Sequence, residues 1–339
     1  MLRTVLNARV DNIGRYAQAA ARGRRGRISF GVMGLNPDAF PWRTTDVRGF
    51  TQAFVHVNPG GAGPLLLVHG WPETARIWWR VIAPWAEAGF EVIAPDLRGF
   101  GRSDLGADGY HDVAASSRDL FALARDHLGH ESVVPVGGDL GGPIIQDLAL
   151  RFRAERFVDR LVLFNSPLPY DKERMAGMRT RPPREAADYF LRQGTDADAL
   201  AAELTTADQR RRYIATFYSS RFWAHPGGFD AEAVDFMTEP FADEAKLRAS
   251  FGAYESTFSQ AARSEPAMMA INPEVEALLL FGPSDHVLYP DFDRMAAVVF
   301  PNHVGPFLLR DCGHFVQWEQ AGTLVGAVRS FCRDLLHTV

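Results

Sequence analysis

Apolar runs that end in small or polar residues recur along the chain at the spacing of buried strands. The first ones are PLLLVHG (64–70), FEVIAPD (90–96), SVVPVGG (132–138) and RLVLFNS (160–166). A continuous apolar run of this length suits a strand that is buried on both faces of a parallel sheet. Residues 46–57 alternate like a strand, and the segments 76–88, 111–128 and 144–152 have helical periodicity. The alternation predicts a doubly wound α/β fold, with a mostly parallel sheet and helices on both faces.

This alternation stops between about residue 168 and residue 262. The stretch carries Ala, Arg and aromatic residues at helical spacing, and Pro182 and Pro183 lie near its start. The alternation resumes at VEALLLFGPSD (275–285), MAAVVF (295–300) and GPFLLRD (305–311), and a terminal helix follows to about residue 336. We therefore expect residues 46–167 and 263–339 to form one α/β core, with residues 168–262 inserted as a helical cap.

The composition is that of an ordinary globular protein and excludes several classes. Of the 339 residues, 47% are hydrophobic and 23% are charged, and the net charge of -5 gives no general attraction to nucleic acid. No apolar run approaches the roughly 20 residues of a membrane helix. Cys312 and Cys332 are the only cysteines, which favours a reducing, cytoplasmic compartment over a disulfide framework. We expect a monomer or a homodimer.

Residues 1–45 form a separate N-terminal segment that is basic at its start. Its arginines are Arg3, Arg9, Arg15, Arg22, Arg24, Arg25 and Arg27. The segment lacks the compact apolar core of a secretory signal. A helical or partly disordered arm is the simplest interpretation, and a transit-like peptide or a contact with an acidic partner stays open.

Polar residues that can carry chemistry cluster directly after the predicted strands. They lie in HGWPE (69–73), GGDLGG (137–142), FGPSDH (281–286) and DCGH (311–314). Ligand sites in open parallel sheets form at the carboxyl ends of the strands. The fold would therefore bring these four stretches together although they are far apart in the sequence.

Asp139 lies in a glycine-rich turn between a predicted strand and a predicted helix. This context matches the nucleophile elbow G-x-S-x-G, with Gly137 and Gly141 at the small-residue positions and Asp in place of Ser. With HGWP, the GFGRS loop (99–103), Asp285 and His314 in the same chain order, residues from about 46 onward resemble the α/β-hydrolase superfamily, and within it the epoxide hydrolases. That resemblance implies an α/β-hydrolase fold with an inserted cap.

The resemblance implies a two-step reaction through a covalent ester. The Asp139 carboxylate would attack a saturated carbon, and water activated by His314 would then hydrolyse the ester, with Asp285 orienting the imidazole. Backbone N–H groups of Trp71 and Leu140 would stabilise the oxyanion on Asp139. His69 would have a structural place in the oxyanion loop.

Each of these residues also has a simpler interpretation when it is considered alone. Asp139 could be an ordinary turn residue, because Asx side chains bind the local backbone. Asp285 could cap a helix at about residues 290–298. His314 could lie beside a turn. Their joint occurrence at strand ends favours the catalytic interpretation.

Opening an epoxide also requires donors for its oxygen, and in the family two cap tyrosines supply them. Tyr189 in DYFLRQG and Tyr254 in FGAYEST match the family's cap motifs, and Tyr213 and Tyr218 are competing candidates. A tyrosine suits this role because its pKa near 10 keeps it protonated at neutral pH. An aromatic residue at helical spacing is, however, more often part of a core.

Four aromatic residues could line an apolar substrate pocket or pack in the core. They are Trp78, Trp79, Phe222 and Trp223. An apolar pocket favours a small lipophilic epoxide as substrate. We expect no metal and no cofactor, since GFGRS lacks the spacing of a dinucleotide-binding loop. A dehalogenase with the same Asp nucleophile, and a non-catalytic ligand-binding member of the fold, are the alternatives. Leu140 offers no side-chain donor to a leaving halide, which favours the epoxide.

Overall fold

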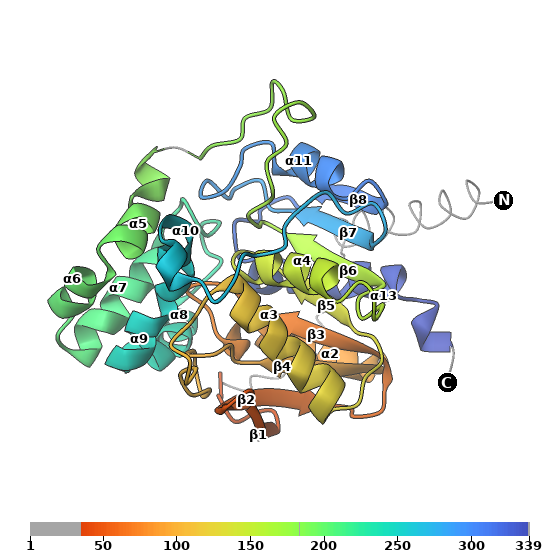
Figure 1. The fold of residues 1–339 in the computed structure, drawn as a ribbon, viewed down its shortest axis with the longest axis horizontal. Coiled ribbons are helices and arrows are strands. Elements are labelled where there is room, and N and C mark those ends of the chain that lie inside the picture. Colours follow the sequence, from red (N-terminus) through yellow and green to blue (C-terminus); the bar gives the residue numbers. More distant parts are fainter. Residues whose placement is uncertain (1–34, 183, 338–339) are drawn as a thin grey trace.

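The computed structural model describes residues 35–182 and 184–337, and within them eight strands form a single sheet (Figure 1). In chain order they are β1 (Trp42–Val47), β2 (Phe50–Val57), β3 (Ala62–Val68), β4 (Phe90–Pro95), β5 (Val134–Gly137), β6 (Arg160–Phe164), β7 (Glu276–Phe281) and β8 (His303–Leu308). Their order across the sheet is β1-β2-β4-β3-β5-β6-β7-β8. Strands β3 to β8 pair in parallel, whereas β1 pairs antiparallel with β2, and β2 with β4. The expected mostly parallel sheet is confirmed.

Helices cover both faces of this sheet, which explains why its central strands are apolar throughout. Helices α3 (Val113–Phe121) and α4 (Gly141–Arg151) pack together on one face, and α2 (Trp79–Glu87) and α13 (Ala321–Phe331) pack together on the other. Helix α11 (Phe292–Val299) lies against β7 and β8. Shorter turns are η1 (Ala75–Trp78), the π-helical turn η2 (Ala122–His127), α12 (Val316–Glu319) and η5 (Leu335–His337).

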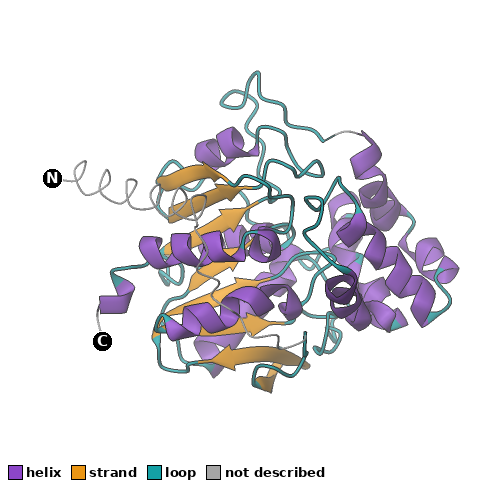
Figure 2. Cartoon of the chain, turned by 180° about the vertical axis from the view of Figure 1, so that it is seen from behind, coloured by secondary structure: helices purple, strands orange, loops and turns teal. Residues whose placement is uncertain are grey.

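A group of short helices lies between β6 and β7 in the sequence. They are α5 (Arg184–Thr195), α6 (Ala197–Glu203), α7 (Ala207–Ser219), α8 (Ala231–Thr238), η3 (Glu239–Ala242), α9 (Glu244–Ser250), α10 (Gly252–Phe258) and η4 (Gln260–Ala262). Figure 2 shows them as a separate layer beyond the ends of the strands toward which the arrows point. All of them fall within the stretch where strand–helix alternation stops. We refer to them below as the inserted helices.

The first part of the sheet differs from the sequence prediction. The single strand expected at 46–57 is a hairpin of β1 and β2, because Arg48 and Gly49 form a turn with positive φ angles of 49° and 87°. Strand β1 also begins at Trp42, inside the segment expected to be an N-terminal arm. The arginines at positions 3 to 27 lie outside the described residues. Within the described part of the chain, no helix combines the length and the apolar character needed to cross a bilayer.

Candidate active site

The sheet topology brings the stretches after β3, β5, β7 and β8 together at one edge. The His314 imidazole lies between two carboxylates there: its Nε2 is 3.0 Å from Asp139 Oδ2, and its Nδ1 is 2.8 Å from Asp285 Oδ2. All three side chains are buried. The structure therefore unites the candidate nucleophile, base and acid: a hydrogen bond joins His314 to Asp285, and an ion-pair contact joins it to Asp139, as the order of the motifs predicts.

Asp139 is held in a strained backbone conformation at the start of α4. Its φ of 43° lies in the left-handed region, which costs a non-glycine residue about 1–3 kcal/mol. Close approach requires the surrounding glycines. A Cβ on Gly141 would lie 2.2 Å from the carbonyl oxygen of Val68, and a Cβ on Gly70 would lie 2.5 Å from the Cβ of Asp139. The glycine frame thus packs the turn against the end of β3 and presents the carboxylate.

The loop after β3 provides a donor for the Asp139 carboxylate. The backbone N–H of Trp71 donates to Asp139 Oδ1 at 2.7 Å, which matches one of the two oxyanion donors expected from the sequence. The other expected donor, Leu140, lies beside Asp139 in the lining of the same cavity. The backbone N–H of Leu140 stays a predicted donor. His69 is fully buried, and its Nε2 accepts the backbone N–H of Leu97, which ties the loop to the chain after β4.

Asp285 is fixed by several donors and is not a helix cap. Its Oδ1 accepts the backbone N–H of Val287 at 2.7 Å, and its Oδ2 accepts the side-chain amide of Asn165 at 2.8 Å. Helix α11 begins after Asp291, which excludes the capping interpretation. The sequence pattern does not single out Asn165, although it lies near the end of the fourth predicted strand, the same kind of position as the other site residues. Its carbonyl also accepts the backbone N–H of Asp139 at 2.7 Å.

The protonation of His314 is controlled by the two carboxylates. Burial alone would lower the pKa of His314, but the nearby charge of Asp285 and the contacts with Asp139 and Asp285 outweigh it. The pKa therefore lies well above the ordinary value of an imidazole. Removal of either negative charge would bring it down again.

The two tyrosines expected to bind the epoxide oxygen lie together opposite Asp139. The rings of Tyr189, on α5, and Tyr254, on α10, are 5.8 Å apart, and both residues line a cavity with Asp139. Burial raises the pKa of both phenols well above 10, and the nearby charge of the Asp139 carboxylate adds to this effect. Both hydroxyls therefore carry their protons at neutral pH and can donate to an oxygen. The competing candidates have other partners: Tyr213 accepts from Gln193, and Tyr218 donates to a backbone carbonyl.

The cavity that contains these groups has a volume of about 660 Å³ and a mostly apolar lining. The apolar residues include Leu140, Leu168, Phe190, Val287 and Leu288. A cavity of this size and lining is typical of a site for a small lipophilic molecule. Within the described residues, no group of three or more His, Cys, Asp or Glu side chains could hold a metal ion.

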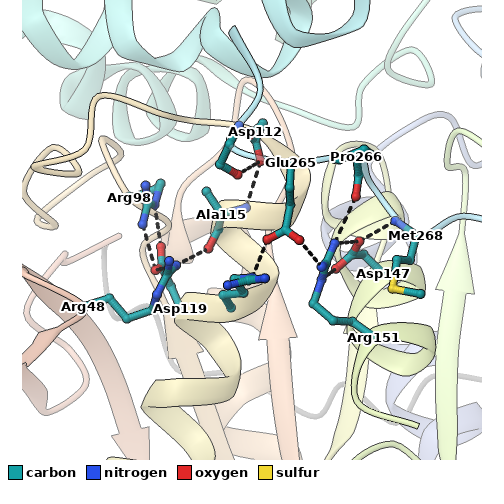
Figure 3. A network of polar contacts seen from close by, with 12 residues as sticks. Arg48, Arg98, Asp112, Ala115, Asp119, Asp147, Arg151, Glu265, Pro266 and Met268 are labelled. Atoms are coloured by element: carbon teal, nitrogen blue, oxygen red, sulfur yellow. Dashed lines mark hydrogen bonds and ion pairs between the residues drawn. The ribbon is translucent and has the colours of Figure 1, made fainter. Parts of the chain in front are cut away.

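One wall of the cavity, formed by the segment after η4, is fastened to α3 and α4 by charged side chains (Figure 3). Asp112 accepts the hydroxyl of Ser264 at 2.9 Å. Arg151 pairs with Asp147 at 2.8 Å and reaches Glu265 at 2.6 Å. Asp147 is fully buried, so its pair with Arg151 lies in a low dielectric, and Arg151 links it to Glu265 in this wall.

None of the four aromatic residues predicted for the pocket is among the residues that line this cavity. Neither Trp78 nor Trp79 is part of the cavity lining: Trp78 is fully buried between other aromatic rings, and the indole N–H of Trp79 donates to the carbonyl of Asn36 at 2.8 Å. Both tryptophans are buried and pack against other aromatic rings. Trp223 packs against His314, with its ring 4.6 Å from the imidazole and its backbone carbonyl accepting the backbone N–H of His314. Phe222 lies next to it at the outer side, near His286.

A further acidic group of the site, Glu73, had no assigned role in the sequence although it ends HGWPE. Its Oε2 accepts the backbone N–H of Gly70 at 2.6 Å, and its Oε1 accepts the side-chain amide of Gln317 at 2.6 Å. Burial, and then the charge of Asp139, raise the pKa of Glu73 to about 8. Glu73 therefore holds a proton at neutral pH and adds no third negative charge beside His314.

The raised pKa of Glu73 predicts a pH-dependent loss of stability. In the unfolded chain the group ionises near its ordinary pKa of 4.5, but in the folded protein only near 8. The folded state binds more protons between these values, so the free energy of unfolding falls as the pH rises through this window. Glu73→Gln removes this effect, and the unpaired Gln317 oxygen can accept the new amide. We therefore expect the difference in Tm between Glu73→Gln and the wild type to be more favourable to the variant at about pH 9 than at about pH 5. Calorimetry at the two pH values measures it.

The exposed Glu155 provides the control for this experiment. Glu155→Gln should follow the wild-type dependence of Tm on pH. Parallel curves for Glu73→Gln and the wild type would show that Glu73 does not hold its proton in the folded state.

Comparison with known proteins agrees with the fold. A family model described as the alpha/beta hydrolase fold matches residues 63–321. An epoxide hydrolase of Caballeronia sordidicola is 26% identical over 327 residues, covering 86% of this chain and 97% of that protein. The bifunctional epoxide hydrolase 2 of Sus scrofa is 25% identical over 324 residues, or 87% of this chain, which spans 57% of that longer protein.

Solved structures show the same architecture. The structure of the epoxide hydrolase CorEH without ligand superposes with a TM-score of 0.73 at 24% identity, covering 87% of this chain and 99% of that one. At this identity the likeness concerns the fold. The family model spans most of the chain and includes the loop after β3, the elbow and Asp285. Together with the parallel sheet and the strained turn at Asp139, this establishes that the chain belongs to the α/β hydrolase fold family.

Proposed function

We propose that the protein is an epoxide hydrolase that converts a lipophilic epoxide and water to a vicinal diol through an ester on Asp139. The observation that carries the proposal is the cavity that Asp139 shares with Tyr189 and Tyr254, with His314 in contact with the carboxylate. The relatives that are named epoxide hydrolases support the same reaction. The cellular compartment and the oligomeric state inferred from the sequence stay predictions.

In the first step, the Asp139 carboxylate attacks an epoxide carbon. The ring carbon–oxygen bond breaks, its electron pair goes to the oxygen, and an ester forms. A carboxylate needs no base for this attack, unlike a serine. The developing alkoxide receives hydrogen bonds and then a proton from the pair of Tyr189 and Tyr254, whose raised pKa values keep the protons on the phenols until this moment.

In the second step, water hydrolyses the ester. Formation of the ester neutralises Asp139, one of the two anions that raise the pKa of His314, so the imidazole becomes able to take a proton from water. The hydroxide attacks the carbonyl carbon, and the oxyanion on Oδ1 accepts the Trp71 N–H. When the carbon–oxygen bond of the ester breaks, His314 protonates the departing diol. The proton released by the Asp139 carboxyl restores the phenol.

A direct comparison of two substrate classes tests this proposal. We expect the purified protein to convert a styrene-type epoxide to its diol and to release no halide from a haloalkane of similar size, measured by chromatography and halide titration. Halide release without epoxide conversion would assign a dehalogenase. Tight binding of an epoxide without turnover of either compound would assign a non-catalytic member of the fold.

The tyrosine pair gives a prediction that concerns the first step alone. Tyr254→Phe and Tyr189→Phe each remove one donor to the epoxide oxygen, and we expect ester formation to slow by about 10²–10³-fold, the usual loss for one oxyanion donor. Hydrolysis of an ester already formed should change far less. Single-turnover experiments with mass detection of the ester separate the two rates.

Tyr213→Phe is the matched control, because Tyr213 lies on α7 outside the cavity and its hydroxyl accepts from Gln193. Its rate of ester formation should stay close to that of the wild type. Equal slowing of both steps in Tyr254→Phe would contradict the assigned role.

A further inference from the structure

The loop that carries the Trp71 donor is held from outside by two polar contacts with the inserted helices. The indole Nε1 of Trp71 donates to Ser250 Oγ at 3.1 Å, and that hydroxyl donates onward to the carbonyl of Leu247 at 2.7 Å. The hydroxyl of Tyr218 donates to the carbonyl of Pro72. Ser250 ends α9 and Tyr218 lies in α7, so the two contacts come from different helices.

Both contacts are deeply buried. Trp71 is 0% exposed, Ser250 is 1% exposed and Tyr218 is 2% exposed. Water therefore cannot replace either partner, and loss of a hydroxyl would leave the indole N–H or the Pro72 carbonyl without a partner. Buried polar pairs of this kind specify one orientation of the groups they join.

The orientation of Trp71 matters because its two N–H groups serve different purposes. The indole N–H fixes the side chain to α9, whereas the backbone N–H donates to Asp139 Oδ1 at 2.7 Å. Aromatic packing also holds the indole: it stacks on Tyr189 at 5.7 Å and meets Phe217 edge to face at 4.7 Å. Packing restricts the position of the ring, and the directional contacts hold the Trp71 side chain and the carbonyl of the next residue, Pro72, so they restrain the backbone on either side of Trp71.

We propose that Tyr218 and Ser250 are positioning residues for the oxyanion hole, so that ester hydrolysis depends on the seating of the inserted helices on the loop after β3. This inference rests on the proposed function, because it concerns the second step of that reaction. The carboxylate attacks without a base in the first step, and a donor to its other oxygen only lowers its nucleophilicity. Loss of the two contacts therefore acts on hydrolysis, where the oxyanion forms on Oδ1.

Single-turnover kinetics of Tyr218→Phe and Ser250→Ala test the proposal. With a styrene-type epoxide, we expect the rate constant of ester hydrolysis to fall by about tenfold to a hundredfold, less than for removal of a whole oxyanion donor. Ester formation should stay near the wild-type rate, so the ester accumulates in the steady state and is detected by mass spectrometry. The two variants remove different contacts with the same loop, and a folding defect would slow both steps, so a loss confined to hydrolysis in both variants indicates the positioning role.

Tyr213→Phe serves as the control again, because it removes a phenol hydroxyl from the same helix as Tyr218 without a contact to the loop. Unchanged hydrolysis in both variants, or equal slowing of the two steps, would overturn the positioning role while the wild type still formed and hydrolysed the ester. Absence of any ester on wild-type Asp139 would overturn the proposed function and this inference together.

Discussion

Asp139→Ala is expected to abolish turnover of every epoxide that the wild type converts. The substitution removes the atom that bonds to the substrate, and the loss should be about 10⁴-fold or more, since removal of the nucleophile of a catalytic triad costs about 10⁶-fold. Epoxide consumption and diol formation are measured by chromatography. Substrate should still bind, because the apolar lining of the cavity is unchanged.

Two controls separate this chemical loss from a structural one. Asp139→Asn keeps the shape of the side chain, and asparagine tolerates the left-handed conformation found here, with φ of 43°. Asp311 has a similar φ of 54° but is exposed, so Asp311→Asn should retain activity. Wild-type turnover in Asp139→Ala would exclude Asp139 as nucleophile.

Isotope labelling of the wild type tests the same step without a substitution. In a single turnover in ¹⁸O-labelled water, the diol takes its new oxygen from the Asp139 carboxylate, and the heavy oxygen enters the side chain. Mass spectrometry should therefore show the ¹⁸O label in the peptide that contains Asp139. Label that appears directly in the first diol would instead indicate attack of water on the epoxide.

The sequence predicts the centre of this site because its determinants are local or topological. Asp139 is presented by a turn of a few residues, and close packing permits only glycine on both sides of it. Asp285 and His314 follow separate strands, and a parallel sheet brings the carboxyl ends of its strands to one edge. Neither inference requires knowledge of side-chain packing.

Features that depend on distant packing could not be predicted in this way. The strand-like alternation continues across Arg48 and Gly49, so the sequence pattern predicts one strand where the structure has the hairpin of β1 and β2. Trp79 follows the HGWPE stretch closely in sequence, but its indole is directed to the carbonyl of Asn36. The partner of Glu73 is Gln317, and no local pattern connects two residues so far apart.

The charge of the site also emerges only from the fold. In the sequence, Glu73 and Asp139 are both acidic residues, and their neighbours do not indicate which of the two holds a proton. In the structure, burial raises the pKa of Glu73 to about 8, so this residue stays protonated at neutral pH. Asp139 instead contacts His314 and accepts the Trp71 N–H. The same residue type therefore takes two roles, which environment alone decides.

His314→Gln is expected to complete the first step and then stop. The carboxylate of Asp139 attacks without a base, so the ester forms, but water is no longer activated. Loss of a general base costs about 10²–10⁴-fold, and the ester should therefore persist for minutes to hours. Glutamine can still donate to Asp285, which lies 2.8 Å from His314 in the wild type and keeps the buried carboxylate paired. Intact-protein mass spectrometry should show an increase equal to the mass of the epoxide.

Peptide mapping should locate this added mass on Asp139, and the double variant with Asp139→Asn should show none. His286 directly follows Asp285 in the sequence but is exposed. The His286→Gln variant should therefore hydrolyse the epoxide at the wild-type rate and carry no adduct. If His314→Gln showed no adduct with an epoxide that the wild type hydrolyses rapidly, the ester would not be an intermediate. His314 would then activate water for direct attack on the epoxide, and the contact of 3.0 Å between His314 and Asp139 would serve only to orient the imidazole.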